Sequence, residues 1–202
     1  GTNIVDLNGD GYSDLWQRQV IVPTLYQNVL LNTGSGFANS PNWTLGDSSV
    51  VFFHENAGGR DLGVRPIDLN GDGLPDMARR HIDDVNWTER NFINNGSALL
   101  EVTDWRNPLG LPFYVDPAGP SSSPGGTEVA DLNGDGLQDL WQRKLGTGGF
   151  AQGILLNTGL TFESSTLWAW AGDWPNFYSE IHGDTGTRLA DINGDGLVDM
   201  WR

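Results

Sequence analysis

Four segments of this 202-residue chain carry acidic and amide side chains at the same spacing. They are DLNGDGYSD from Asp6, DLNGDGLPD from Asp68, DLNGDGLQD from Asp131 and DINGDGLVD from Asp191. The shared pattern, D-x-N-x-D-G-x-x-D, puts oxygen-bearing side chains at positions one, three, five and nine. Calcium takes six to eight oxygen ligands at roughly 2.3–2.6 Å. Each segment is therefore predicted to wrap around one calcium ion, about four in all.

The predicted ligands are the four side chains of each loop and the backbone carbonyl at position seven. In chain order the sets are Asp6, Asn8, Asp10, Tyr12 and Asp14; Asp68, Asn70, Asp72, Leu74 and Asp76; Asp131, Asn133, Asp135, Leu137 and Asp139; and Asp191, Asn193, Asp195, Leu197 and Asp199. A glycine follows position five each time, where a sharp turn at positive φ suits glycine alone. Asn-Gly and Asp-Gly also occur as plain turn formers, but four copies that keep the last Asp favour metal binding.

The flanking residues exclude an EF-hand. That motif starts in the same way but needs a Glu at its twelfth position and a helix on each side. The twelfth residues here are Gln17, Arg79, Gln142 and Arg202, and the segment after each loop is short and strand-like.

The composition agrees with metal loops. There are 26 acidic and 11 basic residues, a net charge of −15, and 12 of the acids are loop Asp residues. Four divalent ions would bring the net charge to about −7. The acidic balance disfavours nucleic acid and anionic membranes as partners, and no run approaches the ~20 apolar residues of a membrane span. Cysteine is absent. Weak sites of this kind suit calcium levels outside cells, so an extracellular, secreted or cell-surface location is predicted.

The loops belong to a longer repeat. Their first Asp residues are 62, 63 and 60 residues apart, and each loop comes after a matched segment, GTNIV, GVRPI, GTEVA or GTRLA. Midway come VLLNTGSGF, FINNGSALL and ILLNTGLTF, which are typical of strand, tight turn and strand. No helical periodicity is sustained. We therefore expect an all-β chain with repeats at 1–62, 63–125 and 126–185 and the start of a fourth at 186–202.

The loop followed by L-N-T-G-x-G-F resembles the FG-GAP/VCBS repeats of integrin α-subunit propellers, propeller lectins and Rhs and toxin-complex proteins. The resemblance implies four-stranded antiparallel blades of a β-propeller, with the loops at blade edges and rings of six to eight blades. The central repeat departs from it, because Ala78 stands where the others have Trp16, Trp141 and Trp201. These tryptophans are predicted to be core between blades. Three blades do not close such a ring, which indicates a piece of a longer chain or head-to-tail self-association.

Two functions remain open at this point. The first is a calcium-binding scaffold for adhesion, protein interaction or structural assembly. The alternative is a calcium-stabilised lectin, in which Trp168, Trp170 and Trp174 form a stacking platform for sugar. The natural partner is then a protein or a glycan outside the cell. The variable segment 104–126 is a second candidate recognition loop, because loops on a rigid scaffold often carry binding residues.

Neither catalysis nor glycosylation has strong support. His54, His81 and His182 stand alone and are predicted to be surface or loop residues, and six Glu residues offer no reason to choose a catalytic pair. We therefore predict that the chain is not an enzyme. Three N-x-S/T sequons are candidate glycosylation sites in a secreted protein. They lie at Asn42, Asn86 and Asn95.

Overall fold

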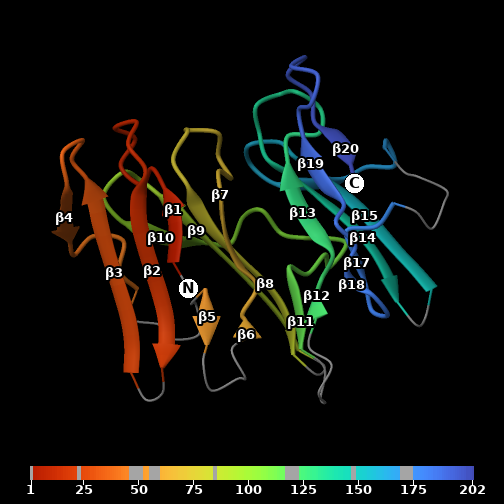
Figure 1. Cartoon of the computed structure of the whole chain (residues 1–202), viewed down its shortest axis with the longest axis horizontal. Helices are drawn as coiled ribbons and strands as arrows, with labels where there is room; N and C mark the ends of the chain where they lie inside the picture. The colour runs from red at the N-terminus through yellow and green to blue at the C-terminus, as the bar shows by residue number, and fades with distance from the viewer. Residues whose placement is uncertain are drawn as a thin grey trace.

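The computed structural model describes residues 2–21, 24–45, 52–54, 60–83, 86–116, 123–146, 149–168 and 175–202. These residues form strands, turns and bends without a helix, so the predicted all-β class is confirmed (Figure 1). The described part of the chain accordingly has no helix of the length and apolarity that crossing a membrane requires.

Each of three successive stretches contains four strands followed by a two-stranded hairpin. The first holds β1 (Thr2–Val5), β2 (Asp14–Ile21), β3 (Thr24–Asn32), β4 (Phe37–Ser40), β5 (Phe53–His54) and β6 (Arg60–Asp61). The second holds β7 (Val64–Ile67), β8 (Asp76–Asp83), β9 (Asn86–Asn94), β10 (Leu99–Val102), β11 (Tyr114–Asp116) and β12 (Ser123–Pro124). The third holds β13 (Thr127–Ala130), β14 (Asp139–Gly146), β15 (Gly149–Asn157), β16 (Phe162–Ser164), β17 (Tyr178–Ser179) and β18 (Gly183–Asp184). The chain ends with β19 (Arg188–Ala190) and β20 (Asp199–Trp201).

The four main strands of each stretch form an antiparallel meander. In the first sheet β1 pairs with β2, β2 with β3 and β3 with β4. The short β1 covers only the first half of the free edge of β2, and β5 pairs in parallel with the second half. The hairpin therefore continues the inner edge of the sheet, and β6 leads the chain toward the next one. The other two sheets repeat this order.

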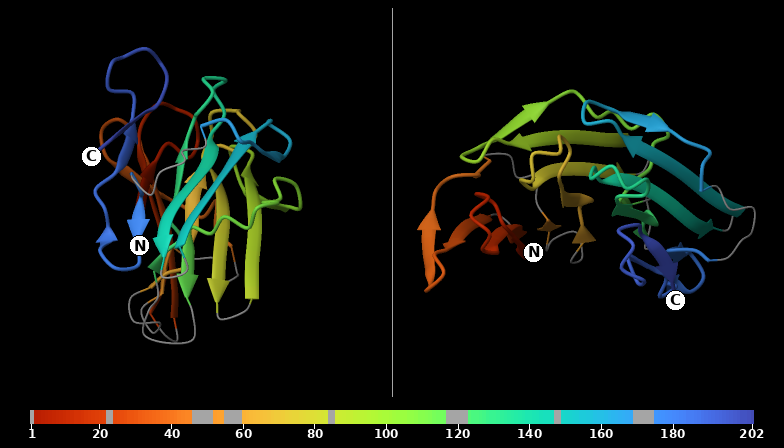
Figure 2. Two further views of the ribbon diagram at one scale, coloured as in Figure 1. Left: turned by 90° about the vertical axis from the view of Figure 1, so that its right-hand side faces the viewer. Right: turned by 90° about the horizontal axis from the view of Figure 1, so that it is seen from above.

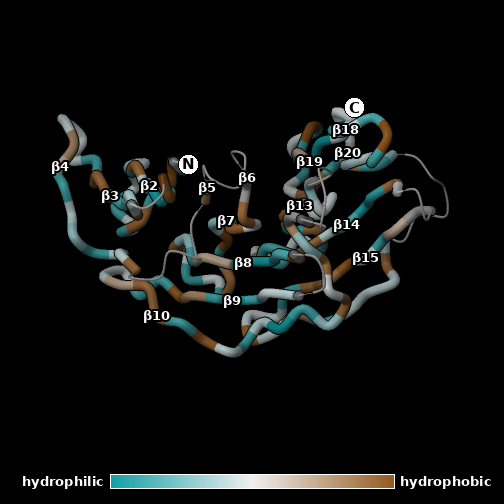
Figure 3. The backbone as a smooth tube through the Cα atoms, turned by 90° about the horizontal axis from the view of Figure 1, so that it is seen from below, coloured by the Kyte–Doolittle hydropathy of each residue, from teal (hydrophilic) through white to brown (hydrophobic). Residues whose placement is uncertain are grey.

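The alternation of side chains explains why the second strand of each sheet forms. Along β2, every second residue from Asp14 to Val20 is buried and the residues between are half-buried. Successive side chains of a strand point to opposite faces of the sheet. Figure 3 shows hydrophilic (teal) and hydrophobic (brown) segments interspersed along the chain. Both faces of this sheet are therefore shielded from solvent at β2, and one face is more deeply buried than the other.

The three sheets stand side by side around an open arc. The view from above in Figure 2 shows the first strands β1, β7 and β13 on the inner side and β4, β10 and β16 on the outer side. The β19–β20 pair forms a separate two-stranded sheet after the third. The described residues thus give several antiparallel four-stranded sheets without a closed ring.

The hydrophobic core lies between neighbouring sheets. The first cluster joins Leu7, Trp16 and Phe52 of the first sheet to Met77 and Phe92 of the second. A second cluster joins the second and third sheets, and a third joins the third sheet to β19 and β20. Because each sheet buries its apolar residues against its neighbour, the sheets depend on one another for stability.

The tryptophans at the shared repeat position follow the prediction in part. Trp16 is fully buried and meets the Phe52 ring edge-on, with the ring centroids 5.2 Å apart. Trp141 is also buried and meets Phe177 in the same way at 5.7 Å. The prediction is wrong for Trp201, which is 49% exposed. No described sheet comes after β20 to cover it.

The second sheet has Ala78 at the tryptophan position, with other apolar residues packed around it. Ala78 is buried in a cluster with Leu111 and Phe113. Leu111 packs so closely on β15 that a Cβ added to Gly153 would lie 2.5 Å from the Leu111 Cδ2. Part of segment 104–126, predicted as a recognition loop, is therefore core.

Candidate metal-binding loops and the contacts that hold them

The first Asp of each loop accepts hydrogen bonds from the backbone of its own loop. In the first loop, Asp6 Oδ1 accepts from Gly9 N at 2.8 Å and Oδ2 accepts from Gly11 N at 2.7 Å. The same two bonds recur in the other three loops. Gly11 has a φ of 88°, a conformation that only glycine adopts without strain. The four loops therefore share one backbone shape.

The side chains at positions three and five contact each other at the exposed rim of the loop. Asn8 Nδ2 donates to Asp10 Oδ2 at 3.0 Å, and Asp10 N donates to Asn8 Oδ1 at 3.2 Å. Tyr12 N donates to Asp10 Oδ1 at 2.9 Å. These contacts bring the predicted ligand oxygens of positions one, three and five to one side of a tight turn.

The position-nine Asp has a structural role that the sequence did not reveal. Asp14 is fully buried at the start of β2. Its Oδ2 accepts from Leu7 N at 2.9 Å, and its Oδ1 accepts from Asn32 N at the end of β3 at 2.7 Å. Asp76 and Asp139 make the same pair of bonds. This carboxylate therefore ties the loop to the second and third strands of its sheet, and each oxygen keeps a second lone pair for an ion.

Burial raises the pKa of two of these position-nine carboxylates. It raises the pKa of Asp76 to about 7, with repulsion from Asp72 and Asp68 adding to the effect and two backbone donors opposing it. Burial likewise raises the pKa of Asp139 to about 6. The pKa of the exposed Asp191 is lowered, chiefly by the hydrogen bond from Gly196 N. The inner carboxylates are thus costly to ionise without a nearby positive charge.

The donor set suits a hard cation, since it consists of carboxylate, amide and carbonyl oxygen. Among the described residues, none of the twelve loop carboxylates forms an ion pair with Lys, Arg or His. In the same part of the chain, no three His, Cys, Asp or Glu side chains gather as a group that could hold a metal ion. Metal binding by these loops stays a prediction.

An asparagine from each later sheet holds the loop of the sheet before it. Asn94 Nδ2 donates to Leu7 O at 2.8 Å, and its Oδ1 accepts from Trp43 Nε1 at 2.6 Å. In the next pair of sheets Asn157 donates to Leu69 O at 2.9 Å and accepts from Trp105 Nε1 at 3.1 Å. Both asparagines are buried. We call this arrangement the Asn–Trp staple; it fixes the loop of one sheet to the midpoint turn of the next.

Neighbouring loops also contact each other directly. The Leu74 side chain of the second loop approaches Gly9 of the first, where an added Cβ would lie 3.0 Å from Leu74 Cδ2. Leu137 approaches Gly71 in the same manner. Position seven, predicted to supply only a backbone carbonyl, therefore packs its side chain on the loop before it.

Trp168, one of the predicted sugar-stacking residues, stands at the repeat position of the staple tryptophans. Trp43, Trp105 and Trp168 are 62 and 63 residues apart, and their φ angles are 57°, 56° and 59°. Trp168 is therefore the third copy of the staple tryptophan. It is 40% exposed, whereas Trp43 is 3% exposed beneath its asparagine. Trp170 and Trp174 lie outside the described residues.

A buried arginine recurs in the three sheets and is not among the residues predicted from the sequence. Arg18, Arg80 and Arg143 lie four residues after the position-nine Asp, and all three are fully buried. They donate to backbone carbonyls of the segment after the fourth strand, at Leu45, Trp105 and Pro175 respectively. The signal was available, because Arg stands at the same repeat position three times.

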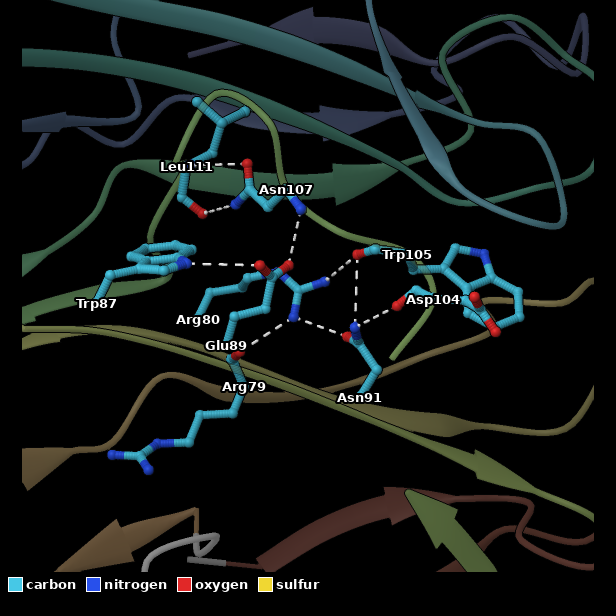
Figure 4. Close-up of polar contacts among 9 residues, drawn as sticks. All are labelled: Arg79, Arg80, Trp87, Glu89, Asn91, Asp104, Trp105, Asn107 and Leu111. Carbon is cyan, nitrogen blue, oxygen red and sulfur yellow. Dashed lines mark hydrogen bonds and ion pairs between the residues drawn. The ribbon is translucent and has the colours of Figure 1, made fainter. Parts of the chain in front are cut away.

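The second sheet surrounds its arginine with the polar network drawn in Figure 4. Arg80 Nη1 donates to Asn91 Oδ1 at 2.7 Å, and Arg80 Nε lies 3.3 Å from Glu89 Oε1. Glu89 Oε1 also accepts from Asn107 N at 2.8 Å. Burial lowers the pKa of Arg80 to about 10, and Glu89 opposes that shift. Gln27 and Gln152 stand in place of Glu89 in the other two sheets, so only this described sheet has a carboxylate there.

The histidine prediction and the predicted glycosylation sites can be compared with the structure in part. His81 is buried on β8 with Nδ1 3.3 Å from Arg79 Nη2, so its prediction as a surface or loop residue is wrong. Asn42 and Asn95 are exposed, and Asn95 Oδ1 accepts from Ala98 N at 2.9 Å. The side chain of Asn86 is outside the described part. Glycosylation stays a prediction.

Comparison with known proteins places the fold but shows no family. No family model matches the chain. It is similar to a T-cell immunomodulatory protein homolog of Plasmodium yoelii yoelii, at 27% identity over 146 residues, and this match takes in 68% of the chain and 20% of that relative. The chain thus spans about a fifth of the curated relative's length.

A solved structure of a lectin from Agrocybe aegerita resembles the whole chain. That structure describes specific recognition of non-reducing terminal N-acetylglucosamine by the lectin. The TM-score is 0.57 with 20% sequence identity, over 98% of this chain and 45% of the lectin chain. At this identity the likeness shows the fold alone.

Proposed function

We propose that this chain is a calcium-binding repeat scaffold of the FG-GAP/VCBS type that acts in adhesion, protein interaction or assembly outside the cell. The observation that carries the proposal is the electrostatics of the four loops. Each loop carries three carboxylates and an amide within nine residues, without an ion pair from Lys, Arg or His in the described residues. Carboxylates about 4 Å apart repel by roughly 1 kcal/mol in water and more when partly buried.

The contacts between loops give calcium a structural role in this proposal. The first three loops each touch the next one through its position-seven side chain, and the Asn–Trp staple holds the first two loops. An ion that fixes one loop would therefore also fix the junction with the neighbouring sheet. The loop carboxylates act as ligands, and no proton transfer is assigned to them.

Calcium titration of the purified chain tests this role. We expect unfolding by urea to require more denaturant with calcium than with chelator. Binding to the folded state alone adds about 2.7 kcal/mol when calcium is a hundredfold above its dissociation constant. Asp72→Asn should remove one site by calorimetry, while Asp104→Asn, an exposed change outside the loops, should remove none. Equal midpoints with calcium and chelator would overturn the proposal.

Carbohydrate binding is the second candidate function. The fold likeness to the Agrocybe aegerita lectin and the exposed indole of Trp168 support it. Aromatic rings commonly line small-molecule sites beside a few polar groups. A glycan array with and without chelator tests this role, and Trp168→Ala tests the stacking platform. Absence of reproducible hits would eliminate this candidate and leave the scaffold role intact.

A further inference from the structure

A small pocket opens on the inner side of the arc, where the second sheet, the third sheet and the final strand pair meet. Its volume is about 240 Å³. Arg65 and Phe113 line it from the second sheet, Glu128, Tyr178 and Asp184 from the third, and Arg188 from β19. Ligand pockets commonly measure about 300–1,000 Å³, so this one suits a single small ring.

The strand register explains why these charges meet. Arg65, Glu128 and Arg188 occupy the same place on β7, β13 and β19, each opposite the shared tryptophan position of its sheet. The first strands all lie on the inner side of the arc (Figure 2). Repetition of one strand position therefore gathers charged side chains around the pocket.

The carboxylate of Glu128 can accept hydrogen bonds from a molecule in this pocket. Its side chain is half-buried, and within the described residues its carboxylate has neither a hydrogen bond nor an ion pair. Burial raises its pKa, while Arg188 and Arg65 lower it. A half-buried carboxylate without a partner is costly. A ligand that donates hydrogen bonds to it would reduce that cost.

The other charged groups of the pocket are balanced. Arg188 donates to Asp184 through both Nη atoms, at 2.9 and 2.6 Å. The Arg65 guanidinium lies over the Phe113 ring, 5.7 Å from its centroid. Two guanidiniums and two carboxylates sum to no net charge, so the pocket does not favour a strongly charged ligand. Donors and acceptors side by side match hydroxyl groups, which both donate and accept.

We propose that this pocket binds one neutral sugar ring at the end of a glycan, with Glu128 accepting hydrogen bonds from its hydroxyl groups. Arg65 and Arg188 are the neighbouring donors, and Phe113 and Phe177 form the apolar wall. The inference rests on the carbohydrate-binding role proposed above. It places a sugar site on the inner side of the arc, apart from the Trp168 segment.

Binding of methyl glycosides of glucose, mannose, galactose and N-acetylglucosamine, followed by saturation-transfer NMR and calorimetry, tests the proposal. We expect saturable binding of at least one glycoside, weakened about tenfold or more in Glu128→Gln, because a hydroxyl loses a charged acceptor. Glu163→Gln is the matched control, since Glu163 is exposed on β16. Equal urea midpoints would show that both variants keep the fold.

The results of these binding experiments distinguish the pocket at Glu128 from the carbohydrate-binding role in general. Glycoside binding that Glu128→Gln leaves unchanged would overturn the pocket and preserve the carbohydrate-binding role. No saturable binding of any glycoside to the wild-type chain would overturn both.

Discussion

The junction of the first and second sheets and the junction of the second and third sheets are built differently at one point. In the first, Trp16 meets Phe52 edge-on. In the second, Ala78 stands at the tryptophan position and clusters with Leu111 and with Phe113, the counterpart of Phe52. The Asn–Trp staple is the same in both. These two junctions therefore share the polar contacts of the staple and differ in the apolar residues that pack between the sheets.

Removing the indole of Trp16 should have the largest effect. Trp16→Ala is expected to lower the free energy of unfolding by about 3–5 kcal/mol, because a fully buried aromatic leaves a cavity. Urea denaturation measures the change. Trp201→Ala is the matched control at the same repeat position and should cost far less, since Trp201 is 49% exposed. Equal losses in the two variants would contradict this view of the first junction.

Restoring the missing tryptophan should damage the second junction. Ala78→Trp is expected to cost about 3 kcal/mol, the upper part of the range for overpacking, because Leu111 and Phe113 already fill the space. Adding Leu111→Ala should recover part of that loss. A double-mutant cycle by urea denaturation measures the coupling between the two positions. Strictly additive losses would show that Leu111 does not substitute for the indole.

Cutting the staple should affect both junctions alike. Asn94→Ala and Asn157→Ala are each expected to cost about 1–2 kcal/mol, because a buried carbonyl and an indole N–H lose their partner. Asn32→Ala is the control in the first sheet. Asn32 is half-buried, and its side chain bonds to Ser13 O of its own sheet. A cost for Asn32→Ala as large as for the other two would contradict a role between sheets.

The smallest expected effect is the loss of stability on acidification from the Asp184–Arg188 pair, at the junction after the third sheet. Hydrogen bonds from Arg188, then from Gly186 N, hold the pKa of Asp184 at about 2. A pKa below the unfolded value means that the pair stabilises the fold at neutral pH and loses this contribution as pH falls from about 4 toward 2. Both side chains are about half exposed, so solvent screens the pair. NMR titration of the Asp184 carboxyl checks the direction, and a pKa at or above 3.8 would contradict it.

The local parts of this protein could be predicted from the chain alone. Four loops, their glycines, the strand-like segments around them and the all-β class all follow from residue type at fixed spacing, because turns and strand alternation depend on near neighbours. Trp16 and Trp141 were also correctly predicted to be core. Arg80 and the staple tryptophans show the same periodicity, and they could have been found by the same reasoning.

The contacts between distant residues could not be predicted. Asn94 meets Leu7 across 87 positions, and Leu111 shares a buried cluster with Ala78, where the second repeat lacks an indole. Glu128 comes to lie between Arg65 and Arg188 only because three inner strands share one side of the arc. The repeat, its loops and its strands can be recognised in the amino-acid order, since they depend on local backbone chemistry. The choice of side chains that are buried together becomes visible only in the folded molecule, because it depends on how one sheet packs against the next.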